Sequence, residues 1–144
     1  CAREIYDEWA RCQHFALYED VRPAMKILHA AGFRIGLISN THRCLTSFQS
    51  HFELDSYISG AVSSSDHGYM KPHPSIFEAA LRLVGVGPSE SVMVGDSLTQ
   101  DILGARRAGM GGVLIERSAG PRASDVDGVP VIRALDELPN LLNP

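Results

Sequence analysis

The chain has little of what several classes of protein require. Its 144 residues include 3 cysteines, at the widely spaced positions Cys1, Cys12 and Cys44, without CxxC or zinc-ligand spacing. We therefore expect free thiols in a reducing cytosol. No apolar run approaches the ~18 residues that span a bilayer, and no signal peptide is visible. The net charge of -4 offers no basic surface to nucleic acid. These features predict a cytoplasmic protein that binds neither membranes nor nucleic acids.

Nucleotide-binding motifs are missing as well. The sequence contains neither Gly-x-Gly-x-x-Gly nor Gly-x-x-x-x-Gly-Lys-Ser/Thr. Its hydrophobic fraction of 44% and charged fraction of 21% are typical of a single globular domain. Short apolar strands, without charges at their centres, alternate with segments of helical periodicity. This βαβαβαβ pattern predicts an α/β fold with a Rossmann-like, doubly wound parallel sheet.

The expected elements follow from periodicity and from start and stop signals. Residues 63–70 are expected to form a loop. Helices are expected at 3–16, 24–31, 42–51, 75–84, from Ser97 to just before Gly109, and at 135–142; strands are expected at 33–38, 57–62, 92–94, 112–115 and 129–132.

The most informative stretch is Val92–Asp101, in which an apolar strand is followed by Gly95 and Asp96. Ser97 or Thr99 can cap the next helix, and Asp101 falls near its first turn. Groups beyond the carboxyl end of a strand face the ligand crevice of an open α/β sheet. At ~4 Å and an effective dielectric near 20, two carboxylates repel by roughly 4 kcal/mol. A cation relieves this repulsion, and oxygen ligands favour Mg²⁺, although a simple turn with a solvated Asp101 is the alternative.

Two further segments carry candidate ligands. Ser39 and Asn40 follow the strand at 33–38 and could bind an anion, or could merely cap a helix. Lys71 precedes Pro72 in a loop stiffened by prolines, where it could serve a site or simply be solvated. His42 and His51 are expected at the surface. His67 and His73 are expected to be loop residues with at most a role in specificity.

Taken in order, these motifs resemble the haloacid dehalogenase-like (HAD) hydrolase superfamily, in its phosphatase branch of phosphoglycolate phosphatases and β-phosphoglucomutases. The resemblance covers nearly the whole chain. The matching segments are Ile38-Ser39-Asn40, Lys71-Pro72-His73-Pro74 with Ile76-Phe77, and Gly95-Asp96-Ser97-x-x-x-Asp101-x-x-Gly104-Ala105 running on to Ala108-Gly109-Met110.

The resemblance implies a role for each matching residue. Ser39 and Lys71 would be catalytic and, together with Asn40, would bind the phosphoryl group of a small phosphorylated substrate. Asp96 would bind Mg²⁺, and Asp101 would support it directly, through water or through hydrogen bonds. These roles agree with the needs of phosphoryl transfer, which depends on positioning and charge neutralisation.

One feature of the family is missing. Its nucleophile is the first Asp of an Asp-x-Asp motif after the first strand, and residues 1–144 contain no apolar strand that ends in this motif. The one Asp-x-Asp, at Asp125 and Asp127, follows the polar residues 120–124, which cannot form a buried strand. We interpret it as a surface turn, with a permuted nucleophile loop as the less favoured alternative.

The resemblance also implies a domain organisation. Residues 1–20 would be the end of a helical cap, and residues 21–144 a HAD-like core without its first strand. In the family that strand lies between those ending at Ser39 and Asp96, and each buried unpaired backbone group costs ~1–3 kcal/mol. We therefore expect a preceding N-terminal segment, or another chain, to complete the sheet, and we expect the 144 residues alone to be inactive.

Three functions are compatible with these observations. The leading hypothesis is a Mg²⁺-dependent phosphatase of a small phosphorylated metabolite, acting through an aspartyl-phosphate on an Asp outside this chain. The second is a non-catalytic relic that binds phosphate or a protein. The third is a 2-haloacid dehalogenase, which Asp96 disfavours because that branch usually has Asn there and needs no Mg²⁺.

Overall fold

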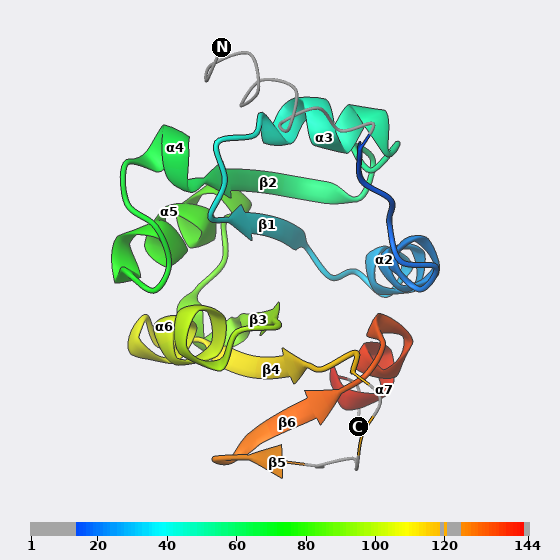
Figure 1. Ribbon diagram of the computed structural model, residues 1–144, viewed down its shortest axis with the longest axis vertical. Helices are drawn as coiled ribbons and strands as arrows, with labels where there is room; N and C mark the ends of the chain where they lie inside the picture. The colour runs from blue at the N-terminus through cyan, green and yellow to red at the C-terminus, as the bar shows by residue number, and fades with distance from the viewer. Residues whose placement is uncertain (1–13, 119, 121–124, 143–144) are drawn as a thin grey trace.

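The computed structural model describes residues 14–118, 120 and 125–142 (Figure 1). Its elements, in chain order, are α2 (Val21–Ala30), β1 (Ile35–Ser39), α3 (Leu45–His51), β2 (Ile58–Ser63), α4 (Ser64–His67), α5 (Pro74–Val84), η2 (Pro88–Glu90), β3 (Val92–Gly95), η3 (Leu98–Ile102), α6 (Leu103–Arg107), β4 (Gly111–Ile115), β5 (Asp125–Val126), β6 (Val129–Ile132), η4 (Leu135–Glu137) and α7 (Leu138–Leu142).

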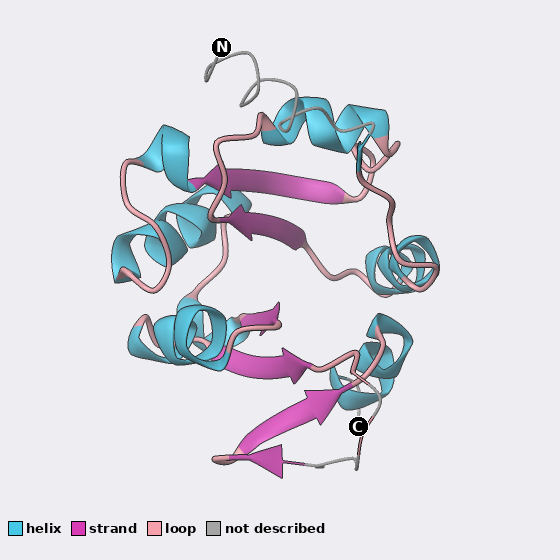
Figure 2. Ribbon diagram, in the orientation of Figure 1, coloured by secondary structure: helices cyan, strands magenta, loops and turns pink. Residues whose placement is uncertain are grey.

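The strands form two sheets. β1 pairs with β2 in parallel, while the second sheet has the order β3-β4-β6-β5. Within it, β3, β4 and β6 are parallel, and only the short β5 runs antiparallel, against β6. Helices accompany both sheets, as Figure 2 shows. The predicted α/β fold with parallel strands and flanking helices is confirmed.

Two apolar cores join the sheets. One is built around Leu28, Val113, Ile132 and Leu138, with Ile35 of β1 and Val94 of β3 packed against it. The other is built around Ile76, Phe77 and Ala105, with Ile38 and Met93 packed against it. Neighbouring residues of β3 thus point to opposite cores, as the alternation of side chains along a strand requires. The two cores hold β1 and β3 in one domain although these strands are not paired.

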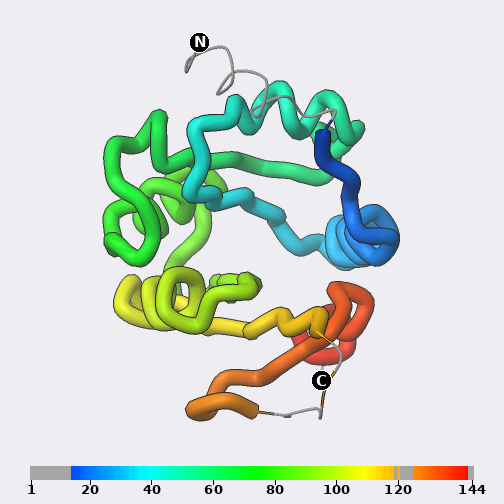
Figure 3. Tube along the Cα trace, viewed as in Figure 1, coloured from blue at the N-terminus to red at the C-terminus, as the bar shows by residue number. Residues whose placement is uncertain are grey.

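β1 and β3 each keep one edge without a ladder partner among the described residues. In Figure 3, the Cα trace of β1 and β2 lies above these two unpaired edges, and the trace of β3 and β4 lies below them. In the part of the chain that is described, no strand lies between them. The interruption falls where the family resemblance implies a further strand.

Most expected elements are present, with boundaries shifted by at most three residues. Ile76 and Phe77 are fully buried on the inner face of α5, as the helical period of residues 75–84 indicates. Three short elements were missed, one of them the 3₁₀ turn η2. The segment expected to be a loop at 63–70 contains α4, which Ser63 caps by accepting a hydrogen bond from the Asp66 N–H at 3.2 Å. The two-residue β5 was too short to give a periodicity signal.

Two other expectations meet different outcomes. The helix expected at 3–16 lies mostly outside the described residues, and residues 15–16 are not helical. Asp125 and Asp127 form the predicted surface turn, in a β5–β6 hairpin with positive φ at Asp127 and Gly128. The Asp125 side chain accepts a hydrogen bond from the Gly128 N–H at 2.7 Å.

No helix among the described ranges is long and apolar enough to cross a membrane.

Candidate functional site

Three loops meet at the carboxyl ends of the parallel strands. Asn40 directly follows β1, Asp96 directly follows β3, and Lys71 lies in the loop between α4 and α5. β1 and β3 belong to different sheets, and the hydrogen bonds of Asn40 to Lys71 and to Gln100 bring the three loops together. The Lys71–Pro72 peptide bond is cis.

Lys71 and Asp101 form a buried ion pair. The Lys71 ammonium donates to Asp101 Oδ1 at 2.5 Å, and the two side chains are only 11% and 5% exposed. The ammonium also donates to the Ile38 carbonyl at 3.3 Å, at the end of β1. Asp101 Oδ2 accepts the Ser97 N–H at 3.0 Å. Both carboxylate oxygens of Asp101 are therefore engaged by the protein itself.

The side chain of Asn40 forms hydrogen bonds with both the N–H and the carbonyl of Lys71. Its Oδ1 accepts the Lys71 N–H at 2.7 Å, and its Nδ2 donates to the Lys71 carbonyl at 3.1 Å. Nδ2 also donates to Gln100 Oε1 at 3.4 Å. The Asn40 side chain thus links the carboxyl end of β1, the loop that carries Lys71 and the turn after β3.

A helical turn with unusual geometry presents Asp101. η3 is a π-helical turn capped by Ser97, whose hydroxyl accepts the Gln100 N–H at 3.2 Å. Such turns are often found at functional sites. A Cβ on Gly95 would overlap the Asp101 side chain, and a Cβ on Gly104 would lie 2.9 Å from the Phe77 ring. These two glycines allow β3 and α6 to approach the site closely.

Ser39 and Asp96 each neighbour, in the chain, a residue that contacts the ion pair. Ser39 is the half-buried last residue of β1, between the Ile38 carbonyl that binds Lys71 and the amide of Asn40. Asp96 is exposed one residue before Ser97, and its carboxylate has no recorded hydrogen bond or ion pair to any residue within the described ranges. The structure therefore joins Asn40 to Lys71, and Lys71 to Asp101, by hydrogen bonds. Ser39 precedes Asn40 in the chain, and Asp96 precedes Ser97, which bonds to Asp101.

The donor set bears on metal binding. Within residues 14–118, 120 and 125–142, no group of three or more His, Cys, Asp or Glu side chains could hold a metal ion. Asp96 offers a free carboxylate, whereas Asp101 is occupied by Lys71. Mg²⁺ fits such a sparse set, because it keeps several waters and is commonly bound by one or two carboxylates together with substrate phosphate.

A second polar cluster lies on the same loop. The Ser75 hydroxyl is 2.8 Å from His67 Nε2 and 2.8 Å from His73 Nδ1. His73 Nδ1 also accepts the Ser75 N–H at 3.2 Å and so caps α5. The Tyr69 ring stacks on His73 with centroids 4.3 Å apart. His73 is a loop residue as expected, whereas His67 is the last residue of α4, contrary to expectation. The contacts of both histidines brace the segment that carries Lys71.

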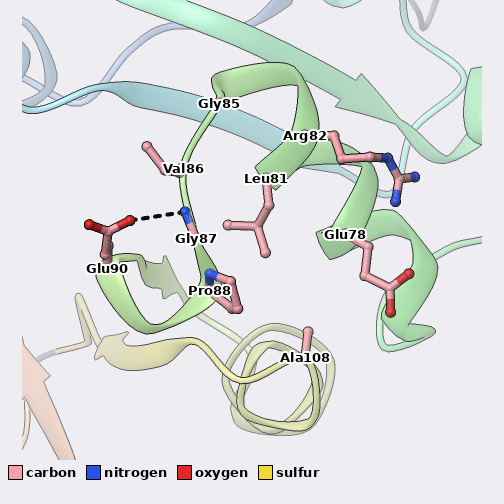
Figure 4. Close-up of a pocket in the computed structure, with 9 residues that line it drawn as sticks. All are labelled: Glu78, Leu81, Arg82, Gly85, Val86, Gly87, Pro88, Glu90 and Ala108. Carbon is pink, nitrogen blue, oxygen red and sulfur yellow. Dashed lines mark hydrogen bonds between the residues drawn. The ribbon is translucent and has the colours of Figure 1, made fainter.

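A shallow hollow of about 560 Å³ lies elsewhere (Figure 4). It is lined by the end of α5, by residues 85–88 and by Ala108 at the end of α6. These segments precede β3 and β4, so the hollow is at the amino ends of the strands, away from Lys71 and Asp101. Glu90 closes one side by accepting the Gly87 N–H at 3.2 Å.

Sequence reasoning missed Gln100, the Ser97 N–H and the Ile38 carbonyl as parts of this site. The last two are backbone groups, which carry no sequence signal. Gln100 is an exposed polar residue within a helical turn, and only its position next to Asp101 could have suggested a role.

The α/β fold brings the buried Lys71–Asp101 pair and Asn40 together at the carboxyl ends of parallel strands. The sequence model of the haloacid dehalogenase-like hydrolase family matches residues 2–109. The chain belongs to this family of hydrolases.

Similar proteins include several phosphatases. Haloacid dehalogenase-like hydrolase domain-containing protein 3 of Danio rerio is 32% identical over 139 residues, which is 96% of this chain and 57% of that protein. Glyceraldehyde 3-phosphate phosphatase of Methanothermobacter thermautotrophicus is 39% identical over 61% of this chain and 39% of its own length. The crystal structure of a HAD phosphatase from Thermococcus onnurineus superposes with a TM-score of 0.83 and 30% identity, covering 99% of this chain and 65% of that one.

The chain thus spans about half the length of the curated relatives that it matches first. The similar proteins include a glyceraldehyde 3-phosphate phosphatase and a HAD phosphatase of known structure.

Proposed function

We propose that the protein to which this chain belongs is a Mg²⁺-dependent phosphatase of a small phosphorylated metabolite. The observation that carries the proposal is the buried Lys71–Asp101 pair at the carboxyl ends of the parallel strands, with Asn40 hydrogen-bonded to the Lys71 backbone. Asp96, which directly follows β3, is exposed. A fixed ammonium in a water-poor site is suited to the charge of a transferring phosphoryl group.

In this proposal, each of the chain's own residues has a defined task. The Lys71 ammonium, oriented by Asp101, neutralises charge on the phosphoryl oxygens and on the nucleophile. Ser39 and the backbone at Asn40 donate hydrogen bonds to those oxygens. Asp96 holds Mg²⁺, which supplies further neutralisation of charge when bound. Together these groups position a phosphomonoester for in-line displacement.

The nucleophile would come from a segment outside this chain. An Asp carboxylate attacks phosphorus, the bond from phosphorus to the alcohol oxygen breaks, and an aspartyl-phosphate forms. Water then hydrolyses the acyl phosphate and releases inorganic phosphate. A second carboxylic acid would give its proton to the departing alcohol and later take one from the water.

The same segment would complete the sheet. β1 and β3 present edges without ladder partners among the described residues, although both pack on shared cores. A strand from an N-terminal segment or from another chain would pair with both edges and deliver its last residues next to Lys71. We accordingly expect the 144 residues alone to be inactive.

Two alternatives rank below this proposal. A non-catalytic protein that binds phosphate or a protein partner would retain the fold but would lack the nucleophile. A 2-haloacid dehalogenase is disfavoured by Asp96, because that branch of the family usually has Asn at this position and needs no metal.

The test uses the full-length protein with a generic aryl phosphate. Mg²⁺-dependent phosphate release is expected for the wild type, and Asp96→Asn should abolish it. Asp127→Asn is a matched control, since it makes the same change at an exposed hairpin residue. Wild-type turnover in Asp96→Asn would refute the metal assignment. Absence of a preceding apolar strand ending in Asp-x-Asp, together with no turnover, would favour the non-catalytic binder.

A further inference from the structure

The amide of Asn40 has little capacity left for a substrate. Its carbonyl oxygen accepts the Lys71 N–H, and its NH₂ group donates to the Lys71 carbonyl and to Gln100 Oε1. An amide NH₂ has two hydrogens, so both are accounted for by protein acceptors. The orientation of the amide is unambiguous, because a backbone N–H can only donate and a backbone carbonyl can only accept.

The backbone N–H and carbonyl of Lys71 depend on the Asn40 amide for their hydrogen bonds. It lies outside any helix or strand, and the following residue, Pro72, has no N–H. Both of its backbone polar groups bond to Asn40. The same end of β1 supplies the Ile38 carbonyl to the Lys71 ammonium. Residues at the end of β1 therefore bind Lys71 in two places: the Asn40 side chain binds its backbone, and the Ile38 carbonyl binds its ammonium.

We propose that the side chain of Asn40 positions Lys71 and does not bind substrate, while the backbone at Asn40 keeps its place beside the phosphoryl group. This inference rests on the proposed phosphatase function, and it gives the side-chain amide a task that the family resemblance does not supply. Without the amide, the Lys71 backbone loses its anchor, and the ammonium is no longer confined between Asp101 and Ile38. Gln100 supports the amide through a longer, 3.4 Å hydrogen bond and has the smaller effect.

The first test measures the accessibility of Lys71 and needs no activity. Lys26 and Lys71 are the chain's lysines, and Lys26 is exposed on α2, so it serves as an internal reference. Acetylation of the full-length protein by an N-hydroxysuccinimide ester is followed by peptide mapping. Asn40→Ala should raise the labelling of Lys71 relative to Lys26 by about tenfold, as expected when two hydrogen bonds are lost.

A control variant and a second variant of Asn40 complete this measurement. Asn140→Asp makes an amide-to-acid change at an exposed residue of α7 and should leave the labelling ratio unchanged. Asn40→Asp keeps an acceptor for the Lys71 N–H but places an oxygen against the Lys71 carbonyl, so it should raise the ratio as well. An unchanged ratio in both Asn40 variants would overturn the proposal.

The second test is a double-mutant cycle on turnover of an aryl phosphate. If Asn40 acts through Lys71, Asn40→Ala lowers kcat in the wild-type background but has little further effect in Lys71→Ala. If Asn40 binds substrate directly, its loss raises KM by the same factor in both backgrounds, which would overturn the proposal. A protein with no turnover in any background would defeat the phosphatase function, while the labelling ratio would still decide the role of Asn40.

Discussion

Lys71 and Asp101 lie 30 residues apart in the chain, yet their charged groups are 2.5 Å apart and almost completely excluded from solvent. A buried pair of this kind is not by itself a source of stability, because both charges lose their hydration. Its consequence lies in what happens when one partner is removed. The remaining charge then stays buried without compensation.

The first prediction concerns that imbalance. Asp101→Asn should lower the free energy of unfolding by about 3 kcal/mol, because it leaves the Lys71 ammonium without its counter-charge. Lys71→Met alone should destabilise for the corresponding reason, and the double variant Lys71→Met/Asp101→Asn should lose less than the sum. Urea unfolding of the four proteins measures the coupling. Additive losses would show that the ion pair is not coupled in solution.

The second prediction concerns Gly95. A Cβ at this position would overlap Oδ2, Cγ and Cβ of Asp101, and Asp101 cannot move without releasing Lys71 and the Ser97 N–H. Gly95→Ala should therefore destabilise the protein by about 2–3 kcal/mol through overpacking. Gly120→Ala is the matched control, because nothing lies within 4 Å of the added Cβ. Equal melting temperatures for the two variants would contradict this account.

Periodicity and end signals were sufficient for much of the fold. The inner face of α5 and the Ser97 cap follow from local patterns, and both are observed. An interruption of the sheet was expected between the strands that end at Ser39 and at Gly95. Among the described residues these two strands are not paired with each other, and the strand that would join them stays a prediction. That expectation came from the family resemblance and not from periodicity, because strand order depends on contacts between distant segments.

The sequence could place the site residues on loops but could not assign their partners. The motif spacing put Asp101 in the same group as Asp96, and nothing in it indicated that both oxygens of Asp101 are taken by Lys71 and Ser97. The engagement of Asn40 with the Lys71 backbone is likewise a contact across 31 residues. Side-chain hydrogen bonds of this range depend on the packed structure, which local pattern does not encode.

The third prediction concerns the pH dependence of stability at Asp20. Burial alone would raise the pKa of Asp20, but hydrogen bonds from Arg117 at 2.9 Å and from the Leu135 N–H at 2.6 Å, with the Arg117 charge, together lower that pKa below its ordinary 3.8. The stabilisation is therefore fully present above the unfolded-state pKa and disappears as pH falls through the lower, folded-state value.

Asp20→Asn should accordingly lose about 2 kcal/mol at neutral pH and match the wild type in strong acid. Unfolding by urea between pH 2 and pH 7, roughly the range over which such carboxylates titrate, measures the difference. Asp55→Asn serves as a control at an exposed carboxylate. A difference between wild type and Asp20→Asn that does not change with pH would argue against a titrating Asp20.

The fourth prediction concerns the thiol of Cys44. This exposed residue precedes α3, and the nearby hydroxyl and N–H of Ser47 favour the thiolate, which lowers the pKa of the thiol below its ordinary 9.0. Since the thiolate is the reactive form, Cys44 should be alkylated by iodoacetamide at a lower pH than an unperturbed thiol. Ser47→Ala should move the midpoint of the rate–pH profile upward, whereas Ser50→Ala, which removes a hydroxyl bonded to Asp55, should leave it in place. Peptide mapping assigns the label to Cys44, and an identical midpoint in wild type and Ser47→Ala would show that Ser47 does not stabilise the thiolate.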